Sequence, residues 1–256
     1  MLFGREYMPE GAGVDPDAPR KKGAARLLEI LSRDLDGIFL SGVLAMLACA
    51  PAAILAGIAL WLGSLPLCLL AAAAAGWLVG PALTCLYDTI LRALRDEPGF
   101  WWHTYKRVWK QSFKSSLVSG IVLTLLWTLV AYAAFVLPQM TTVSAGFALV
   151  LVVDMVLLLT LGSYYWMQNA LFDASVSKKL SNCVRMLLGF LPRTALSAVF
   201  QLGYWLLMAA VIPRCAFISL LTGLWLPNLL AMLAVYAPIE KSLHLEEQIQ
   251  AKREND

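Results

Sequence analysis

Long apolar runs alternate with polar segments along the chain. A helix needs about 20 predominantly apolar residues to cross the roughly 30 Å hydrocarbon core of a bilayer, and six runs are close to or above that length. They cover residues 37–62, 65–86, 117–137, 145–167, 194–212 and 215–237. The pattern predicts an all-α, polytopic integral membrane protein with six transmembrane helices, and it excludes a water-soluble enzyme.

The connections between these runs alternate between short and long. Those near residues 63–64, 138–144 and 213–214 are short, whereas 88–116 and 172–193 are long and charged. We therefore expect three transmembrane hairpins whose short turns share one side of the bilayer. The predicted organisation is a cytoplasmic N-terminal segment (1–36), a transmembrane domain (37–237) with cytoplasmic amphipathic segments at 88–116 and 172–193, and a cytoplasmic C-terminal tail (238–256).

Composition and charge support this interpretation and orient the chain. Hydrophobic residues make up 60% of the sequence and charged residues 14%, against about 25% charged residues in soluble domains. Of the 20 Lys and Arg residues, 19 fall in the predicted terminal and long connecting segments, and only Arg214 falls in a short turn. Because cytoplasmic loops are enriched in Lys and Arg, both termini are expected on the cytoplasmic side.

Small residues predict close packing within the first hairpin. They are Ala48, Ala52 and Ala56 on one face of the first run, and Ala72, Gly76 and Gly80 on the second. Small residues four apart let the backbones of two membrane helices approach closely.

The long connection after the second run contains a dense aromatic segment. Trp102, Tyr105, Trp109 and Phe113 lie on one helical stripe, with basic residues on the opposite face. This pattern is typical of an amphipathic helix that lies at the membrane interface. The alternative is a helix that docks on a partner protein, with Trp102, Trp109 and Phe113 as contact residues.

The segment 172–193 is also amphipathic, and its spacing resembles the coupling loop of bacterial ABC importer permeases. The matching positions are Asp173-Ala174-Ser175 and Leu191-Pro192, and the loop likewise lies between the fourth and fifth runs. Lys179 and Gly189 depart from the glycine and isoleucine of that pattern. The resemblance implies contact with an ATPase or permease subunit through Asp173, Ala174, Leu191 and Pro192.

Three polar residues stand at similar depth inside the predicted helices. Asp154 is the one acidic residue well inside a run, where a charge costs about 2.5–3.5 kcal/mol on insertion scales. Gln201 and Asn228 fall at comparable depth, so the three are expected to form one polar layer in the bundle. Asp154 would then serve a permeation path or proton relay, or it would fix helix packing as a protonated or hydrogen-bonded carboxyl.

Diffuse motifs spread over residues 3–240 resemble the YesL-like family of bacterial membrane proteins, a domain of unknown function. They include Gly11-x-Gly13-Val14-Asp15 with Pro19-Arg20-Lys21-Lys22, Gly80-Pro81-Ala82-Leu83 with Tyr87, the segment Trp109 to Lys114, and Leu191-Pro192-Arg193-Thr194. The first run departs from the family pattern, because it lacks the expected Asn-x-x-Trp start. The resemblance implies a multi-pass protein of the bacterial plasma (inner) membrane whose relatives are commonly encoded beside carbohydrate ABC importers.

These observations lead to a functional hypothesis without a catalytic centre. The protein is expected to be an accessory or permease-like component of a carbohydrate ABC uptake system. A stand-alone small transporter or channel that uses Asp154 and a non-transporting membrane scaffold remain alternatives. No enzymatic motif, metal-ligand spacing or cofactor motif occurs in the sequence, so we expect no catalytic residues, metal, cofactor or nucleic acid. The expected partners are the lipid bilayer and ABC importer subunits.

Overall fold

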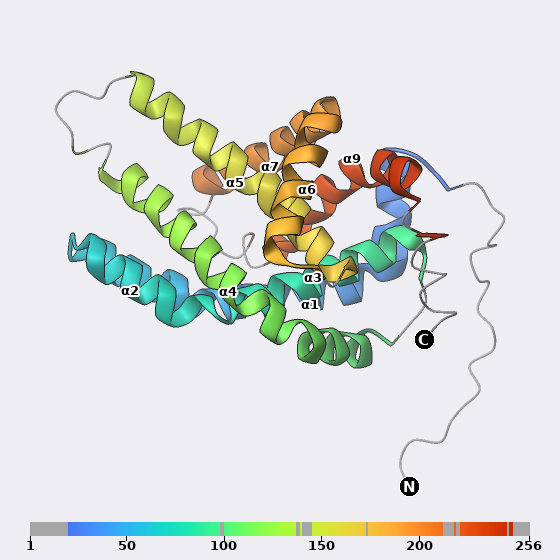
Figure 1. Ribbon diagram of the computed structural model, residues 1–256, viewed down its shortest axis with the longest axis horizontal. Helices are drawn as coiled ribbons and strands as arrows, with labels where there is room; N and C mark the ends of the chain where they lie inside the picture. Colours follow the sequence, from blue (N-terminus) through green and yellow to red (C-terminus); the bar gives the residue numbers. More distant parts are fainter. Residues whose placement is uncertain are drawn as a thin grey trace, which may run out of the picture.

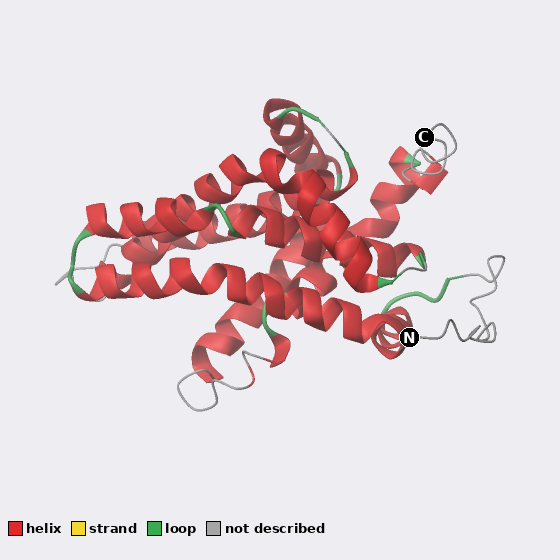
Figure 2. Ribbon diagram, turned by 90° about the horizontal axis from the view of Figure 1, so that it is seen from below, coloured by secondary structure: helices red, strands yellow, loops and turns green. Residues whose placement is uncertain are grey.

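A computed structural model describes residues 20–97, 100–136, 139, 145–172, 174–211, 218, 221–244 and 246–247. Within these residues the secondary structure is helical, with no strand, as Figure 2 shows. The all-α prediction is therefore confirmed for this part of the chain. The main helices are α1 (Ala24–Trp61), α2 (Leu65–Gly76), α3 (Val79–Arg95), α4 (Trp101–Val136), α5 (Ala145–Leu171), α6 (Val176–Gly189), α7 (Leu191–Val211) and α9 (Trp225–Leu243).

Several of these helices are long and apolar enough to lie in a membrane. Within the described residues α1, α4 and α5 each qualify as candidate spans, and the number rises to five if each of two bent pairs is one span. One pair is α2 with α3, bent by 54°, and the other is α6 with α7, bent by 99°. The structure therefore supports an integral membrane protein with three to five candidate spans. The sixth span and the hairpin arrangement stay predictions.

Two helices extend well beyond the apolar runs that predict them. α1 has 38 residues and α4 has 36, which correspond to about 57 Å and 54 Å of helix at a rise of 1.5 Å per residue. The aromatic segment is thus not a separate interfacial helix, because it forms the first turns of α4. Residues 101–116 contain neither Gly nor Pro, so no local signal ends the helix between the aromatic segment and the apolar run.

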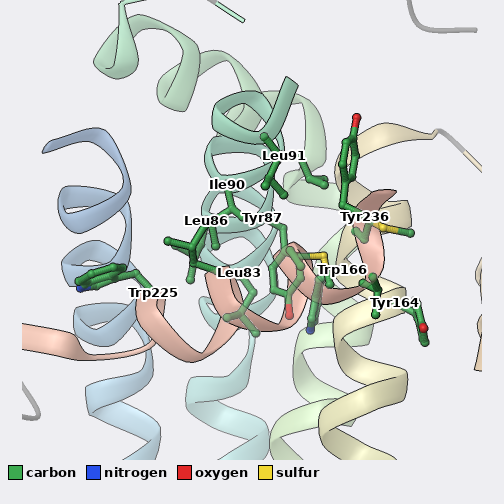
Figure 3. Packing of buried hydrophobic residues seen from close by; sticks show 14 of the residues in the cluster. Leu83, Leu86, Tyr87, Ile90, Leu91, Tyr164, Trp166, Trp225 and Tyr236 are labelled. Atoms are coloured by element: carbon green, nitrogen blue, oxygen red, sulfur yellow. The ribbon is translucent and has the colours of Figure 1, made fainter. Parts of the chain in front are cut away.

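The helices are arranged so that the two ends of the molecule differ. The turn between α1 and α2, the end of α4 and the start of α5 lie at one end, and the start of α1 and the end of α3 lie at the other (Figure 1). α3 is at the centre of the packing, since α1, α4, α5 and α9 all contact it. Figure 3 shows its residues Leu86, Ile90 and Leu91 between the side chains of Trp225 and Tyr236 from α9.

α3 and α4 cross at a point where their backbones touch. A Cβ atom placed on Gly80 would lie 2.0 Å from the Ser116 carbonyl oxygen, and one on Gly120 would lie 2.5 Å from the Gly80 backbone nitrogen. Gly76 likewise faces α4, at Ile121 and Thr124. The predicted first hairpin does pack, since α1 contacts α2 and α3, but the atoms nearest to Gly76 and Gly80 belong to α4, which the prediction did not include. Small residues show that a helix is approached closely but do not identify which helix approaches it.

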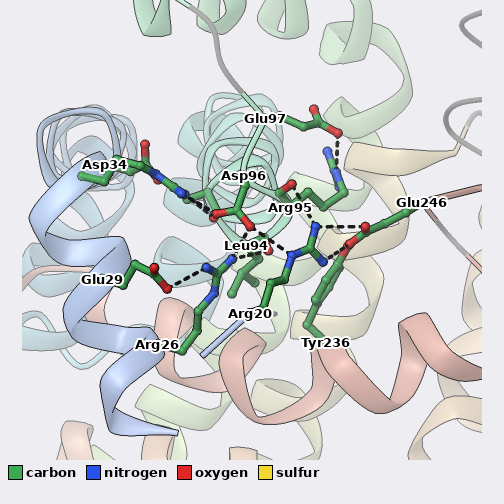
Figure 4. A network of polar contacts seen from close by, with 12 residues as sticks. Arg20, Arg26, Glu29, Asp34, Leu94, Arg95, Asp96, Glu97, Tyr236 and Glu246 are labelled. Carbon is green, nitrogen blue, oxygen red and sulfur yellow. Dashed lines mark hydrogen bonds and ion pairs between the residues drawn. The ribbon is translucent and has the colours of Figure 1, made fainter. Parts of the chain in front are cut away.

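A network of charged side chains gathers at the end of α3 (Figure 4). Asp96 ends this helix in a left-handed conformation (φ 61°) and accepts hydrogen bonds from Arg20, Arg26 and Arg33. Arg20 also donates to Glu246. The N-terminal segment, the connection after α3 and the C-terminal tail, all predicted to be cytoplasmic, therefore meet at the same end of the molecule.

Candidate functional site

A cavity of about 580 Å³, open to the outside of the bundle, lies among six helices, α1, α3, α4, α5, α7 and α9. Its walls are mostly apolar, with side chains such as Leu83, Leu123 and Leu158. Among the described residues, none that lines the cavity is an Asp, Glu, Lys, Arg or His. The volume lies within the range of about 300–1,000 Å³ that is usual for sites that bind one small molecule.

A polar layer closes one part of this cavity, and it takes one residue from each of four helices. These residues are Tyr87 (α3), Ser163 (α5), Gln201 (α7) and Asn228 (α9). The Tyr87 hydroxyl lies 2.8 Å from Asn228 Oδ1 and 3.0 Å from Ser163 Oγ, and Gln201 Nε2 donates to Ser163 Oγ at 3.1 Å. Ser163 in turn donates to the Leu159 carbonyl oxygen. Hydrogen bonds thus join four helices that are far apart in the sequence.

Trp166 lines the cavity and carries a buried polar atom. Its side chain is 2% exposed, and its indole Nε1 has no hydrogen-bond partner. Figure 3 shows this nitrogen and the phenol oxygen of Tyr87 pointing in the same direction. A buried donor without an acceptor costs about 1–3 kcal/mol. This indole N–H therefore lies within the packed wall and is not exposed to the cavity space.

The predicted layer of Asp154, Gln201 and Asn228 forms only in part. Gln201 and Asn228 belong to the polar layer and are linked through Ser163 and Tyr87. Asp154 does not join them, because it is exposed on the outside of α5, more than two turns before Ser163. The part of the prediction that groups Asp154 with the other two is wrong.

Sequence reasoning missed two members of the layer and the free donor. Tyr87 stands out in the sequence as the polar residue after an apolar run and as part of a YesL-like motif, but neither feature assigns it to a polar layer. Ser163 is a small hydroxyl that helices in membranes tolerate at many positions. Trp166 is one of nine tryptophans, and nothing in its neighbours separates it from an ordinary core residue. Only the packing of α3 against α5 brings these side chains together.

The helix α6 is a second candidate surface, on the connection between α5 and α7. Buried hydrogen bonds fix it to the bundle: Lys179 Nζ donates to Asn169 Oδ1 at 2.6 Å, and Asn169 Nδ2 donates to Thr84 Oγ1 at 2.8 Å. Gln168 Nε2 donates to the Lys179 carbonyl oxygen. Since Asn169 lies on α5 and Thr84 on α3, α6 is connected to two helices that also line the cavity.

The predicted docking residues of the coupling-type segment flank α6. Ala174 is half-buried just before the helix, and Leu191 and Pro192 are exposed at the start of α7. Asp173 lies outside the described residues. The 99° bend between α6 and α7 places these residues at the two ends of a helix that runs across the direction of α7.

The aromatic residues at the start of α4 pack against each other and against α1, α2 and α3; Trp101 Nε1 donates to Ser41 Oγ on α1 at 2.6 Å. Tyr105 is buried, its carbonyl oxygen faces Cys85 Sγ, and its ring stacks on Trp109 at 6.1 Å between centroids. Phe113 contacts Trp77 edge to face at 6.2 Å. Trp102 is exposed and carries Lys106 Nζ 4.6 Å from its ring centroid. Packing therefore accounts for Trp109 and Phe113, and docking by Trp102 stays a prediction.

Comparison with known proteins finds a family model that is similar to part of the first half of the chain. No curated protein and no solved structure matches the chain. A family model does match residues 39–133, which include α2, α3 and the Gly80–Gly120 crossing, together with most of α1 and α4. That model is described as "Protein of unknown function, DUF624", and the match confirms the resemblance to the YesL-like family, which belongs to DUF624.

Proposed function

We propose that the protein is an accessory subunit of a carbohydrate ABC uptake system and that α6 is the helix that docks on a cytoplasmic partner subunit. The observation that carries the proposal is an exposed apolar stripe on a helix that is firmly anchored to the bundle. The type of partner comes from the family resemblance and from the coupling-type motifs around α6.

The stripe has the spacing of a helix that fits a groove. Val176, Leu180, Val184 and Leu188 follow one another at intervals of four residues and are between 45% and 63% exposed. Residues at such intervals share one helical face, and an amphipathic helix uses this face as a row of anchors in a hydrophobic groove. Lys178 and Arg185 are exposed beside the stripe and are available to acidic groups at the rim of such a groove.

The buried face of α6, which adjoins the stripe, explains how a docking event would reach the membrane domain. Lys179, Cys183 and Met186 are buried against the bundle, and Lys179 connects α6 to α5 and α3 through Asn169 and Thr84. Buried, mutually satisfied polar networks hold elements in one geometry. A force on α6 would therefore move α3 and α5 with it.

The cavity favours an accessory role over direct passage of sugar. A sugar carries many hydroxyl groups, each of which needs a hydrogen-bond partner when it leaves water. The cavity offers few such groups, and those of the polar layer already bond to each other. Asp154 gives no support to a stand-alone transporter, because it does not line the cavity.

The experiment is extraction from native membranes in a mild detergent, followed by identification of the subunits that co-purify. The wild-type protein is expected to retain an ABC-type ATPase or permease subunit, and the double variant Leu180→Ser with Val184→Ser is expected to lose it. The matched control is Val199→Ser with Leu206→Ser on α7, two residues of similar exposure, which should retain the partner. The absence of any such subunit, or its equal retention by both variants, would count against the proposal.

A further inference from the structure

We propose that the outward face of the first turns of α4 binds the headgroup of an anionic phospholipid. Four cations form this basic face, namely Lys106, Arg107, Lys110 and Lys114. The inference goes beyond the accessory role and does not depend on a partner subunit. It rests on where the four side chains lie, on the charge around them and on the apolar surface that follows on the same helix.

The four cations of the basic face lie on the outside of the bundle. Lys106, Lys110 and Lys114 repeat every four residues, and Arg107 lies between the first two, so all four share one side of the helix. Each of them is exposed, whereas Tyr105 on the other side of these turns is buried. The aromatic stripe of α4 is thus used for packing inside the protein, and its cations are left for a ligand outside.

No acidic side chain among the described residues neutralises the basic face. The sequence contains no Asp or Glu between Glu97 and Asp154. The arginines at the end of α3 differ, because Arg26 and Arg33 both form ion pairs with Asp96. The basic face therefore keeps its charge for an anion that does not come from the described part of the chain.

The surface of α4 changes from basic to apolar one turn after Lys114. Val118, Val122 and Leu126 are between 41% and 63% exposed, and the helix qualifies as a candidate membrane span. Val118 lies four residues after Lys114, which is about 6 Å along the helix axis. Because the exposed apolar side chains need hydrocarbon around them, the basic face lies at the depth of the phosphates in the adjoining leaflet.

This arrangement favours an anionic lipid over a zwitterionic lipid and over a free phosphate. A zwitterionic headgroup carries an ammonium that the basic face would repel, whereas an anionic headgroup has no such group. Each Lys or Arg near a membrane surface raises the affinity for anionic lipid about fivefold. The acyl chains of the same molecule would contact Val118 and Val122, and a free phosphate has no chains to do so.

The experiment counts the lipids that the full-length protein retains in a mild detergent, by native mass spectrometry. The protein is mixed with equal amounts of phosphatidylglycerol and phosphatidylcholine, and the wild type is expected to prefer phosphatidylglycerol. The triple variant Lys106→Gln, Lys110→Gln and Lys114→Gln should reduce this preference about tenfold or more. The triple variant with arginine at the same three positions keeps the charge and should keep the preference.

A matched control removes the same charge from another part of the surface. Lys178, Arg185 and Arg193 are exposed on α6 and α7, and changing all three to glutamine should leave the lipid preference unchanged. Because this control alters α6 and the test variant does not, loss of a partner subunit and loss of the lipid are separate outcomes.

The position of the bound lipid is tested with a phosphatidylglycerol that carries a photoreactive diazirine at the headgroup end of one acyl chain. This probe is expected to label α4 around Val118 and Val122, and the glutamine triple variant of α4 should reduce the labelling. The soluble headgroup glycerophosphoglycerol should not compete at the same concentration.

Four results would overturn the proposal. Equal retention of the two lipids by the wild type would show that the basic face does not select an anionic headgroup. An equal loss of preference in the two glutamine triple variants would mean that only the total charge matters. Labelling confined to other helices would place the lipid elsewhere, and equal competition by glycerophosphoglycerol would identify the ligand as a soluble anion.

Discussion

Replacing Gly80 by alanine is expected to force α3 and α4 apart. The added Cβ atom would lie 2.0 Å from the carbonyl oxygen and 2.8 Å from the carbonyl carbon of Ser116, and 3.2 Å from the Cα atom of Gly120. All three are backbone atoms, so no side chain can rotate away. Since Cβ contacts under 3.0 Å essentially do not occur, the helices must separate locally by about 1 Å or more.

The size of the effect follows from two opposing contributions. Overpacking of a tight interior typically costs about 1–3 kcal/mol, and a clash with rigid backbone belongs at the upper end of that range. Alanine favours the helical state over glycine by about 1 kcal/mol. The expected net loss in the free energy of unfolding is therefore about 2 kcal/mol. The Gly80 carbonyl oxygen accepts a hydrogen bond from Thr84, which also bonds Asn169, so the anchoring of α6 should loosen as well.

The assay is reversible unfolding in detergent micelles, followed by far-ultraviolet circular dichroism. Gly203→Ala is the matched control, because its Cβ atom would meet nothing within 4 Å, and it should be as stable as the wild type or slightly more stable. A Gly80→Ala variant as stable as Gly203→Ala would refute the reasoning, since it would show that the backbones of α3 and α4 do not touch at this crossing.

Three further predictions concern the charged end, the polar layer and the topology. Burial would raise the pKa of Asp96, but hydrogen bonds from the arginines outweigh this effect and lower it. The Asp96 carboxylate therefore stabilises the fold above about pH 4 and loses that contribution as the pH falls through the folded-state pKa. Asp96→Asn should lower the free energy of unfolding at pH 7 by about 2 kcal/mol and flatten its dependence on pH below 4, and an unchanged acid profile would contradict this. Tyr87→Phe removes the hydroxyl that joins Asn228 to Ser163 and should cost about 1 kcal/mol, measured by the same unfolding assay; no loss would show that the layer does not hold the helices together. A cysteine placed at Ser64 should react with a membrane-impermeant maleimide from outside the cell and one at Lys110 should not; labelling of the Lys110 position from outside would reverse the predicted topology.

The apolar runs located the helical segments, and their bounds agree closely with the structure for α5 and α7. Residues 145–167 predicted α5, which the structure extends only to Leu171. The run 65–86 appears instead as α2 and α3 with a break at Trp77 and Leu78, because hydropathy measures only whether a segment is apolar and not whether its axis is straight. The extension of α4 back to Trp101 joins an aromatic and an apolar segment that differ in composition but share helical backbone geometry.

For α5, the sequence did not indicate which side chains point into the bundle. This helix is apolar on all sides, so its periodicity does not indicate which face is buried. Asp154 and Ser163 are both polar residues on it, yet Asp154 is exposed and Ser163 is buried in the polar layer. For Gln201 and Asn228, the distance in sequence from the ends of the apolar runs was enough to group them, because both side chains point into the bundle.

The sequence by itself determined that the chain is a helical membrane protein, because the length and hydropathy of a segment are local properties and the cost of burying polar groups in hydrocarbon acts on each segment separately. It also located the family motifs and the amphipathic segment that becomes α6. The tertiary structure decided which helices touch. Three features depend on residues from helices that are distant in the chain: the Gly80–Gly120 crossing, the polar layer and the cavity beside Trp166. Packing between membrane helices depends on shape complementarity and hydrogen bonds across the whole bundle, and no single segment specifies these.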